Sequence, residues 1–333
     1  MKRRLKRMVK WTGIVIASAL ALLLATGATV QALSTRAAFR RYKAPGRMVD
    51  VGGYKLHIHC TGEAHENVPT VVLESGLGGW TIDWASVQPE IAKTSRVCSY
   101  DRSGHGWSER GPSSAGTRAG IAKQLHALLQ AAHVPGPYVL VGHSLGGMYI
   151  REFARRYPSD VVGMVFVDSS HEEMGKKATS AERKEAVGQM KMLRFLRYLM
   201  PFGAQRLVKQ PVSNAKDLSE ADRPIAYGIG YKTGAYFAFY DEASSLLGED
   251  EGGTLRLDRV PDVPIVTIAA ESNVQKQDWW LGLQTELSEL SSDGELVIAE
   301  GSGHFVHVDK PHLVIEAIEK IVKKGVNREE EAS

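Results

Sequence analysis

The chain has 333 residues and a formal net charge of +3. Residues 1–47 hold 11 of the 41 lysines and arginines and no acidic residue, which leaves 30 basic against 38 acidic residues in the rest. This mildly acidic remainder argues against nucleic-acid binding, and its length suits one α/β domain with an insertion. Two cysteines are too few for a disulfide scaffold or a cysteine-rich metal site.

The N-terminus combines a basic segment, residues 1–10, with residues 11–33, which carry no charge. A membrane-spanning helix needs about 20 apolar residues, whereas the apolar part of a signal peptide is usually about 7–15 long. Length therefore favours a transmembrane anchor followed by a linker, residues 34–46. The alternative is cleavage near Val30-Gln31-Ala32 and secretion. Since the basic end should stay cytoplasmic, we expect a single-pass protein of the cell membrane with its folded part outside the cytoplasm.

The first elements after the linker are predicted strands. Residues 47–51 and 54–59 alternate as in a hairpin that turns at Gly52-Gly53. His57 and His59 share one face of the second strand. No further metal ligands cluster with them in sequence, so we predict ordinary strand histidines and no metal site.

Glycine-containing turns follow the next two predicted strands. Residues 70–73 lead into Glu74-Ser75-Gly76-Leu77-Gly78-Gly79-Trp80, and residues 96–100 lead into the turn at 101–108, which begins Asp101-Arg102. The glycine spacing of the first turn is not that of a dinucleotide-binding loop, so we expect no cofactor. Residues 117–132 then have the apolar periodicity of an amphipathic helix.

The most informative stretch lies between residues 138 and 157. Residues 138–141 form a short β-branched run typical of a buried strand, and residues 149–156 have helical periodicity. Between them stands Gly142-His143-Ser144-Leu145-Gly146, a G-x-S-x-G motif at a strand-to-helix corner. The glycines let strand and helix approach closely, while the serine takes a strained turn that exposes its hydroxyl.

With this motif the chain resembles the α/β-hydrolase superfamily, in its serine-hydrolase branch. The resemblance implies a mostly parallel eight-stranded sheet flanked by helices, with a helical cap inserted after the sixth strand. It divides the chain into a core, residues 47–169 and 261–325, and a cap, residues 170–260. It also implies that Ser144 is the nucleophile.

The resemblance further implies an oxyanion hole formed by the backbone N–H groups of Leu77 and Leu145. Leu145 lies at a helix start, where partial positive charge favours an anion. In relatives the first turn usually reads His-Gly-x-Gly, and here Ser75 stands at the position of that histidine. The turn at 101–108 resembles the loop after the fourth strand, in which we expect His105 to shape the loop.

The acid of the expected triad has three candidates. Most relatives place it shortly after the penultimate strand, predicted at 263–270, but that position holds Asn273, and an amide cannot stabilise an imidazolium by charge. In some relatives, including haloalkane dehalogenase-like enzymes, the acid follows the sixth strand, where Asp168 aligns. We favour Asp168, with Glu271 and Asp278 as alternatives.

His304 is the expected general base. It lies in Gly301-Ser302-Gly303-His304-Phe305 after a predicted final strand, residues 295–299, and before a predicted helix, residues 312–322. This matches the histidine loop of the family, and the order Ser144, acid, His304 is the order of the superfamily. We predict that residues 326–333 form a disordered tail. Three other histidines lack this context and are predicted surface or loop residues: His171, His307 and His312.

Two further features follow from the resemblance. The fold would place the strand that ends at Cys60 beside the strand that contains Cys98, so a disulfide is plausible in an oxidising compartment, with two buried thiols as the alternative. The cap has apolar clusters at 190–202 and 227–240. These either pack on the core or form an apolar acyl pocket with a cationic rim at the membrane surface, and Trp279-Trp280 either line that pocket or anchor their helix.

The expected activity is hydrolysis of small-molecule carboxylic esters with apolar acyl groups, through an acyl-enzyme on Ser144. A serine nucleophile argues against epoxide hydrolases and haloalkane dehalogenases, which use an aspartate. It does not separate an esterase from a thioesterase, peptidase, C–C hydrolase or perhydrolase. A non-catalytic homologue that uses the pocket for binding is the alternative from a different class.

Overall fold

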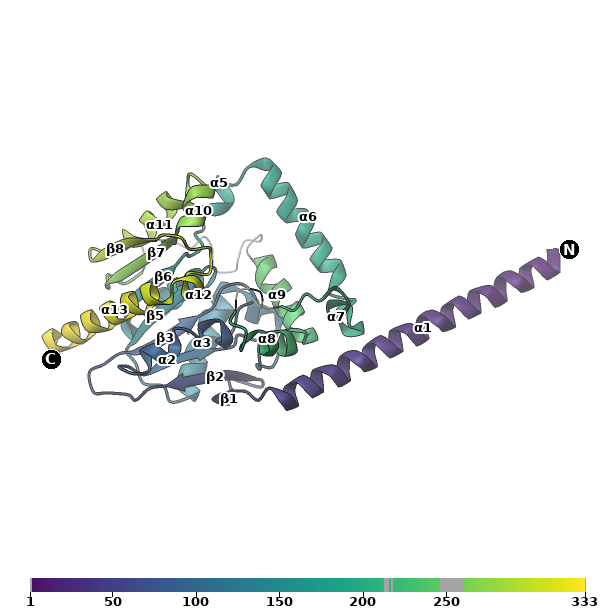
Figure 1. The fold of residues 1–333 in the computed structure, drawn as a ribbon, viewed down its shortest axis with the longest axis horizontal. Coiled ribbons are helices and arrows are strands. Elements are labelled where there is room, and N and C mark those ends of the chain that lie inside the picture. The colour runs from purple at the N-terminus through teal and green to yellow at the C-terminus, as the bar shows by residue number, and fades with distance from the viewer. Residues whose placement is uncertain (1, 213–215, 217, 246–259, 333) are drawn as a thin grey trace.

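The computed structural model describes residues 2–212, 216, 218–245 and 260–332. Its centre is an eight-stranded sheet in the order β1-β2-β4-β3-β5-β6-β7-β8 (Figure 1). The pairs β1–β2 and β2–β4 are antiparallel, and the other neighbouring strands are parallel. This confirms the expected fold class. The strands are β1 (Arg47–Asp50), β2 (Lys55–Thr61), β3 (Thr70–Glu74), β4 (Val97–Tyr100), β5 (Tyr138–His143), β6 (Val161–Val167), β7 (Ile265–Ala270) and β8 (Gly294–Ala299).

Helices cover both faces of the sheet because successive strand residues point to opposite sides. Val72 and Leu140 pack in a core with α3 (Arg118–Ala131), α4 (Gly146–Arg156) and α11 (Trp280–Ser288). Val71 and Val139 pack in a second core with α2 (Gln88–Ile91) and α13 (Pro311–Ala332). Strands buried on both faces read as continuous apolar runs, which is why they were visible in the sequence. Short helices join these elements: η1 (Thr81–Trp84), η2 (Ser113–Gly116), η3 (Pro158–Asp160), α10 (Glu271–Lys276) and α12 (Val306–Asp309).

All regular secondary structure that the structure describes between β6 and β7 is helical, with loops and turns joining the helices. Residues 246–259 of the predicted cap lie outside the described residues. Figure 1 shows these helices on one side of the sheet, with α6 reaching down towards α7. The cap helices are α5 (Met174–Lys177), α6 (Ser180–Leu196), η4 (Met200–Phe202), α7 (Ala204–Val208), α8 (Arg223–Gly230) and α9 (Thr233–Ser245).

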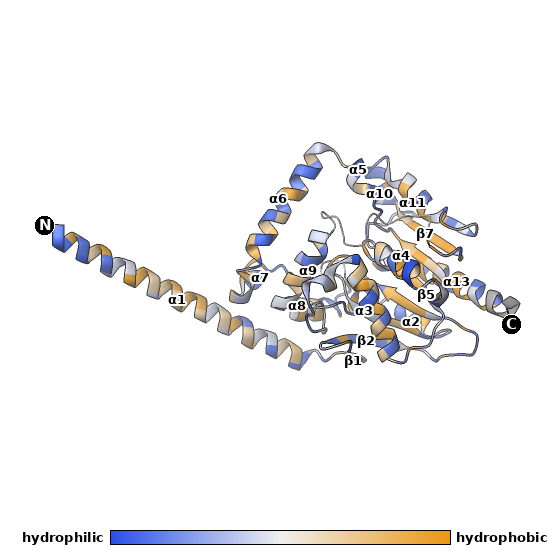
Figure 2. Ribbon diagram, turned by 180° about the vertical axis from the view of Figure 1, so that it is seen from behind, coloured by the Kyte–Doolittle hydropathy of each residue, from blue (hydrophilic) through white to orange (hydrophobic). Residues whose placement is uncertain are grey.

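The N-terminal helix α1 (Lys2–Arg41) projects from the rest of the molecule (Figures 1 and 2). Among the described residues, only α1 is long and apolar enough to cross a membrane. The helix continues to Arg41, so the prediction of a linker at 34–46 was wrong for most of that segment. The reason is packing, because Ala38, Phe39 and Tyr42 join an apolar cluster with the cap residues Ala226 and Ile229.

The C-terminal helix α13 runs to Ala332, so the predicted disordered tail was wrong for residues 326–332. Residue 333 lies outside the described residues. The glutamates that close the sequence are good helix formers, and they extend a helix already fixed by packing of Ile318 and Ile321 on the sheet.

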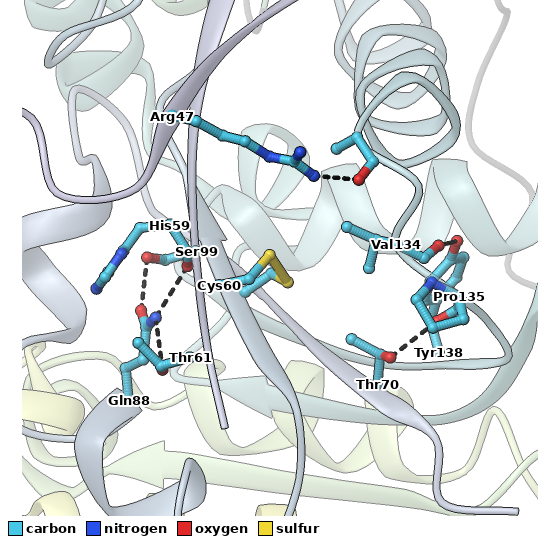
Figure 3. Close-up of a disulfide and its surroundings, with 12 residues drawn as sticks. Arg47, His59, Cys60, Thr61, Thr70, Gln88, Ser99, Val134, Pro135 and Tyr138 are labelled. Carbon is cyan, nitrogen blue, oxygen red and sulfur yellow. Dashed lines mark hydrogen bonds between the residues drawn. A yellow bond between two sulfur atoms is a disulfide. The ribbon is translucent and has the colours of Figure 1, made fainter. Parts of the chain in front are cut away.

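A disulfide joins Cys60 of β2 to Cys98 of β4, so of the two alternatives that the sequence left open the structure has the bridge and not two free thiols (Figure 3). The two residues lie directly opposite each other in the antiparallel pair. No free cysteine remains in the chain.

We expect the double substitution Cys60→Ser with Cys98→Ser to lower the free energy of unfolding by about 4 kcal/mol, because the bridge restricts an unfolded loop of 38 residues. Chemical unfolding in a mild detergent measures the difference, and reduced wild-type protein is the matched control. Labelling of the denatured, non-reduced protein should find no free thiol; two labelled thiols would contradict the bridge.

Candidate active site

Ser144 occupies the corner between β5 and α4 with a left-handed backbone conformation, φ 52°. Only glycine fits at the flanking positions. A Cβ on Gly142 would lie 2.7 Å from the backbone of Gly146, and a Cβ on Gly146 would lie 2.5 Å from the carbonyl oxygen of Glu74. The serine is partly exposed while its neighbours His143 and Leu145 are buried. The corner therefore has the geometry of a nucleophile elbow.

His304 and Asp168 come together at the same edge of the sheet. Asp168 follows β6, and His304 lies in the loop after β8, so both leave the carboxyl ends of parallel strands. The Nδ1 atom of His304 lies 2.6 Å from Oδ2 of Asp168, a hydrogen-bond distance in which the imidazole donates. Asp168 is fully buried, whereas His304 is partly exposed.

Three further donors hold the Asp168 carboxylate. The backbone N–H of Ala270 donates to Oδ1 over 2.9 Å, and Nε1 of Trp280 donates to the same atom over 2.8 Å. Nδ2 of Asn273 donates to Oδ2 over 2.5 Å. Asn273, which stands where the resemblance led us to look first for an acid, thus donates to the carboxylate of the favoured candidate. The sequence analysis did not predict this role of Trp280, because nothing in the sequence around a tryptophan indicates which distant residue accepts its hydrogen bond.

The other two candidate acids have different surroundings. Oε2 of Glu271 accepts a hydrogen bond of 2.7 Å from the N–H of Gly301, so this carboxylate shapes the loop that leads to His304. Asp278 is exposed. The structure therefore brings Asp168, of the three, into contact with the imidazole.

Two buried imidazoles surround His304. The ring of His143 lies 4.7 Å from that of His304 and 4.3 Å from that of His307. Burial lowers the pKa of His143 well below its usual range and that of His307 to about 3, with the neighbouring histidines acting in the same direction. Both are therefore neutral near pH 7, and a positive charge that develops on His304 meets no charged histidine there.

The prediction of surface or loop positions for the other three histidines was wrong only for His307, which is buried in α12; His171 lies in a loop, as predicted. His312 is exposed, but His171 and His307 are buried. Residues after a loop motif read as surface positions in sequence, whereas His307 packs its ring 4.7 Å from Trp84 beneath the site.

The turn after β3 lies directly beside Ser144. A Cβ on Gly76 would lie 3.0 Å from Cβ of Ser144. Leu77 packs against an apolar cluster that contains Leu145, so the two expected oxyanion donors belong to neighbouring segments. Ser75, at the position of the usual histidine, accepts a hydrogen bond of 3.0 Å from Nε1 of Trp84 and is buried in the turn.

Arg102 holds this turn from below. Its guanidinium donates to the carbonyl oxygens of Ser75 and Gly76 over 2.8 and 2.7 Å, and to the carboxylate of Glu74 over 2.6 Å. The same guanidinium donates to both carboxylate oxygens of Glu242 in α9, over 2.8 and 3.0 Å. One buried cation thus joins the turn after β3 to the cap.

The two carboxylates that contact Arg102 have pKa values shifted in opposite directions. Complete burial raises the pKa of Glu74 to about 7, although Arg102 and Tyr100 act in the opposite direction. Burial would also raise the pKa of Glu242, but Arg102 and His105 outweigh it and lower the value to about 2. His105 lies 3.1 Å from Glu242, so it anchors the cap as well as shaping its loop.

The strand histidines do not face a common partner. His57 lies 2.9 Å from Asp101, where burial alone would lower its pKa but the carboxylate raises it. Burial lowers the pKa of His59. Within the described ranges, no group of three or more His, Cys, Asp or Glu side chains is placed to hold a metal ion.

An apolar cavity of about 330 Å³ opens beside the turn after β3. Leu77 and Gly78 line it together with residues of α6, η4, α7 and α9 and of the segment 210–212. Trp279 and Trp280 are not part of its lining; Trp280 instead holds Asp168. The cap residues that line the cavity include Met192, Leu193, Leu196, Met200, Val208, Tyr236 and Phe239.

Substitution of Glu74 by glutamine should remove a pH dependence of stability. The raised pKa means that the folded protein binds more protons than the unfolded chain between pH 4.5 and about 7, so stability falls as pH rises through this window. One pKa unit corresponds to about 1.4 kcal/mol, which limits the loss to about 3 kcal/mol. Chemical unfolding of wild type and Glu74→Gln in detergent, at pH 5 and pH 8, tests this. Equal pH dependence in both proteins would disprove the assignment.

Comparisons with known proteins agree with this geometry. The sequence model of the alpha/beta hydrolase family matches residues 71–317. An uncharacterised protein of Schizosaccharomyces pombe is 28% identical over 327 residues, covering 85% of this chain and 57% of that protein. An uncharacterised vacuolar membrane protein of Saccharomyces cerevisiae is 32% identical over 136 residues, covering 36% of this chain and 21% of that protein. The chain thus spans less than two thirds of the length of these relatives.

Solved structures extend the likeness to the fold. The epoxide hydrolase CorEH without ligand aligns with a TM-score of 0.64 at 18% identity, covering 83% of this chain and 97% of that chain. Identity this low speaks for a common fold and not for a common reaction.

Proposed function

Because the chain belongs to the α/β hydrolase family, we propose that it is a serine hydrolase that cleaves carboxylic esters with apolar acyl groups. The observation that carries the proposal is the 2.6 Å contact between His304 and Asp168 at the sheet edge that also presents Ser144. The apolar cavity beside Leu77 supports an apolar acyl group.

The proposed mechanism is acyl transfer in two steps. His304 takes the proton of Ser144 as the hydroxyl attacks the ester carbonyl, and the N–H groups of Leu77 and Leu145 stabilise the oxyanion. His304 then protonates the leaving alcohol, and water hydrolyses the acyl-enzyme by the reverse roles. Asp168 keeps the imidazole in the tautomer with its proton on Nδ1 and stabilises the imidazolium.

The serine at the elbow argues against some of the reactions that share this fold. Epoxide hydrolases use an aspartate there to form an alkyl-enzyme, and Ser144 cannot play that part. Thioesterase, peptidase, C–C hydrolase and perhydrolase chemistry remain alternatives, because they use the same triad with a different pocket. A non-catalytic homologue would keep the pocket without a reactive Ser144.

We also propose that α1 anchors the protein in the cell membrane as a single-pass helix, with the folded part outside the cytoplasm. The apolar length of α1 and the basic residues 2–10 support this topology. The Cys60–Cys98 bridge supports an oxidising compartment. Secretion after cleavage is the alternative.

Asp168→Asn should lower kcat by about four orders of magnitude with the fold intact, because the neutral amide no longer fixes the imidazole tautomer. A fluorophosphonate probe and turnover of p-nitrophenyl butyrate measure the effect. Labelling should be absent in Ser144→Ala and strongly slowed in Asp168→Asn. The matched control Glu271→Gln should keep near-normal turnover. A large loss in Glu271→Gln with normal Asp168→Asn would move the acid to Glu271, and unlabelled, folded wild type would favour the binding homologue.

The cavity predicts a preference for acyl length. We expect kcat/KM for p-nitrophenyl esters to rise from acetate to octanoate by about tenfold or more, since each buried methylene contributes about 0.8 kcal/mol until the cavity is filled. Leu196→Asp, which places a charge in the cavity lining, should remove most of this preference while leaving acetate turnover within about threefold. Equal kcat/KM for all chain lengths in the wild type would contradict an acyl pocket.

A further inference from the structure

The helix α1 contacts the rest of the protein along only part of its length. The side chains of residues 2–23 are exposed all round the helix. From Leu24 onward one face is covered at every third or fourth residue, which is the spacing of a helix packed on one side. The covered positions are Leu24, Gly27, Ala28, Gln31, Ser34, Thr35, Ala38 and Phe39.

The cap is the part that covers this face. A Cβ on Gly27 would lie 2.6 Å from the carbonyl oxygen of Phe202, so the backbones of α1 and η4 touch there. Arg206 of α7 donates to Oε1 of Gln31 over 2.8 Å and to the hydroxyl of Thr35 over 3.2 Å. The amide of Gln31 donates to the carbonyl oxygen of Tyr231 over 2.7 Å. Residues 27–35 therefore fix the position of η4 and α7.

The span of a bilayer overlaps this contact. A hydrocarbon core of about 30 Å takes about 20 helical residues at 1.5 Å each. The uncharged stretch begins at Trp11, after Lys10, so such a span extends to about Val30. Gly27, which touches η4, lies within it, and the polar contacts of Gln31 follow immediately. If α1 crosses a bilayer, η4 and α7 must then lie at its outer surface.

The surface of the cap formed by α7 and the C-terminal end of α6 has the composition expected at a lipid interface. Leu207 and Val208 of α7 are 84% and 67% exposed, and Phe195 at the end of α6 is 68% exposed. Figure 2 shows α6 as a mixture of hydrophilic and hydrophobic residues. Exposed basic side chains stand among the apolar ones, as expected where a protein meets anionic lipid head groups. These are Lys191, Arg194 and Lys209.

The same surface leads into the apolar cavity. Val208 and Met192 are exposed, and both also line the cavity that reaches Leu77. An apolar path thus connects the end of α6 and α7 with the turn that carries an expected oxyanion donor. The cavity volume of about 330 Å³ is at the small end for ligand pockets, which favours a single acyl chain.

We propose that η4, α7 and the C-terminal end of α6, here called the docking corner, lie in the outer interface of the bilayer. The substrate is then an ester amphiphile with one acyl chain, which enters the cavity directly from the lipid. The proposal rests on the proposed ester hydrolysis and on α1 as a membrane anchor, and it adds the surface and the source of the substrate.

Spin-label depth measurements test the docking corner without any need for activity. Because both native cysteines are bridged, a single new cysteine can be labelled selectively. The full chain is placed in vesicles of phosphatidylcholine and phosphatidylglycerol with a nitroxide at Leu207→Cys. Lys184→Cys, near the N-terminal end of α6 and away from the docking corner, is the matched control. Leu22→Cys in α1 is the membrane reference. Collision rates with oxygen and with a water-soluble nickel chelate report depth.

We expect the labels at 22 and 207 to collide mainly with oxygen, and the label at 184 to collide mainly with the nickel chelate. A label at 207 that behaves like that at 184, while position 22 reports lipid, overturns the docking corner and leaves the anchor standing. A label at 22 that reports water removes the anchor and the inference together. Low collision rates with both reagents at 207 indicate a covering protein partner and overturn the lipid assignment.

The source of the substrate is tested by Phe195→Asp with Leu207→Asp, neither of which lines the cavity. We expect kcat/KM for monooleoylglycerol in vesicles to fall at least about tenfold, because charges oppose interfacial binding, while kcat/KM for soluble p-nitrophenyl acetate stays within about twofold. Val187→Asp, an exposed apolar position further along α6, should leave both rates unchanged. Unchanged vesicle rates, or an equal fall on both substrates, overturns entry from the lipid. Wild type without activity on either ester would instead refute the proposed function, and the spin-label result would stand by itself.

Discussion

The buried guanidinium of Arg102 is the interaction on which the geometry of the candidate site depends. A cation without water must be matched by acceptors, and Arg102 meets two carboxylates and two backbone carbonyl oxygens. Because those acceptors belong to the turn after β3 and to α9, neither segment can shift without leaving a buried charge unpaired. The ring of Tyr149 on α4 lies under the same guanidinium, at 5.2 Å, so the helix that starts beside Ser144 joins the arrangement. The turn after β3, helix α4 and the cap helix α9 all contact the side chain of Arg102.

The carboxylate of Asp168 shows how two neighbouring strands of this fold can bring an acidic side chain to the same imidazole. Asp168 follows β6, whereas Asn273 stands at the usual acid position after β7. Adjacent parallel strands end at the same edge, so a carboxylate from either strand can reach the imidazole of His304. Asn273 retains a hydrogen bond to that carboxylate, and Trp280 and Ala270 complete its surroundings. In the proposed triad, the carboxylate at Nδ1 of His304 therefore comes from β6 and not from β7.

The parts of the fold and site that were predictable from the sequence are those with local signatures. Buried strands show as apolar runs, and the corner at Ser144 shows as glycines at fixed offsets, because both are decided by near neighbours. The contact of Asp168 with His304 could be anticipated only by analogy with relatives, since 136 residues separate them. The pairing of Arg102 with Glu242 spans 140 residues and left no trace in either segment. The linker was mispredicted for the same reason, because packing on the cap accompanies α1 as far as Arg41. The tail was mispredicted for a local reason, because good helix formers continue α13 beyond its packed part.

The packing of α1 on the cap bears on whether the N-terminal segment can be a detachable leader. A cut near Val30-Gln31-Ala32 would fall within the covered face of the helix. Arg206 would lose the acceptor at Gln31, and the backbone of η4 at Phe202 would lose the close contact with Gly27. The mature protein would then expose a surface shaped to hold a helix that is no longer there. Through this interface α1 is a structural part of the folded domain, and removal of its N-terminal portion would take away contacts that hold the cap.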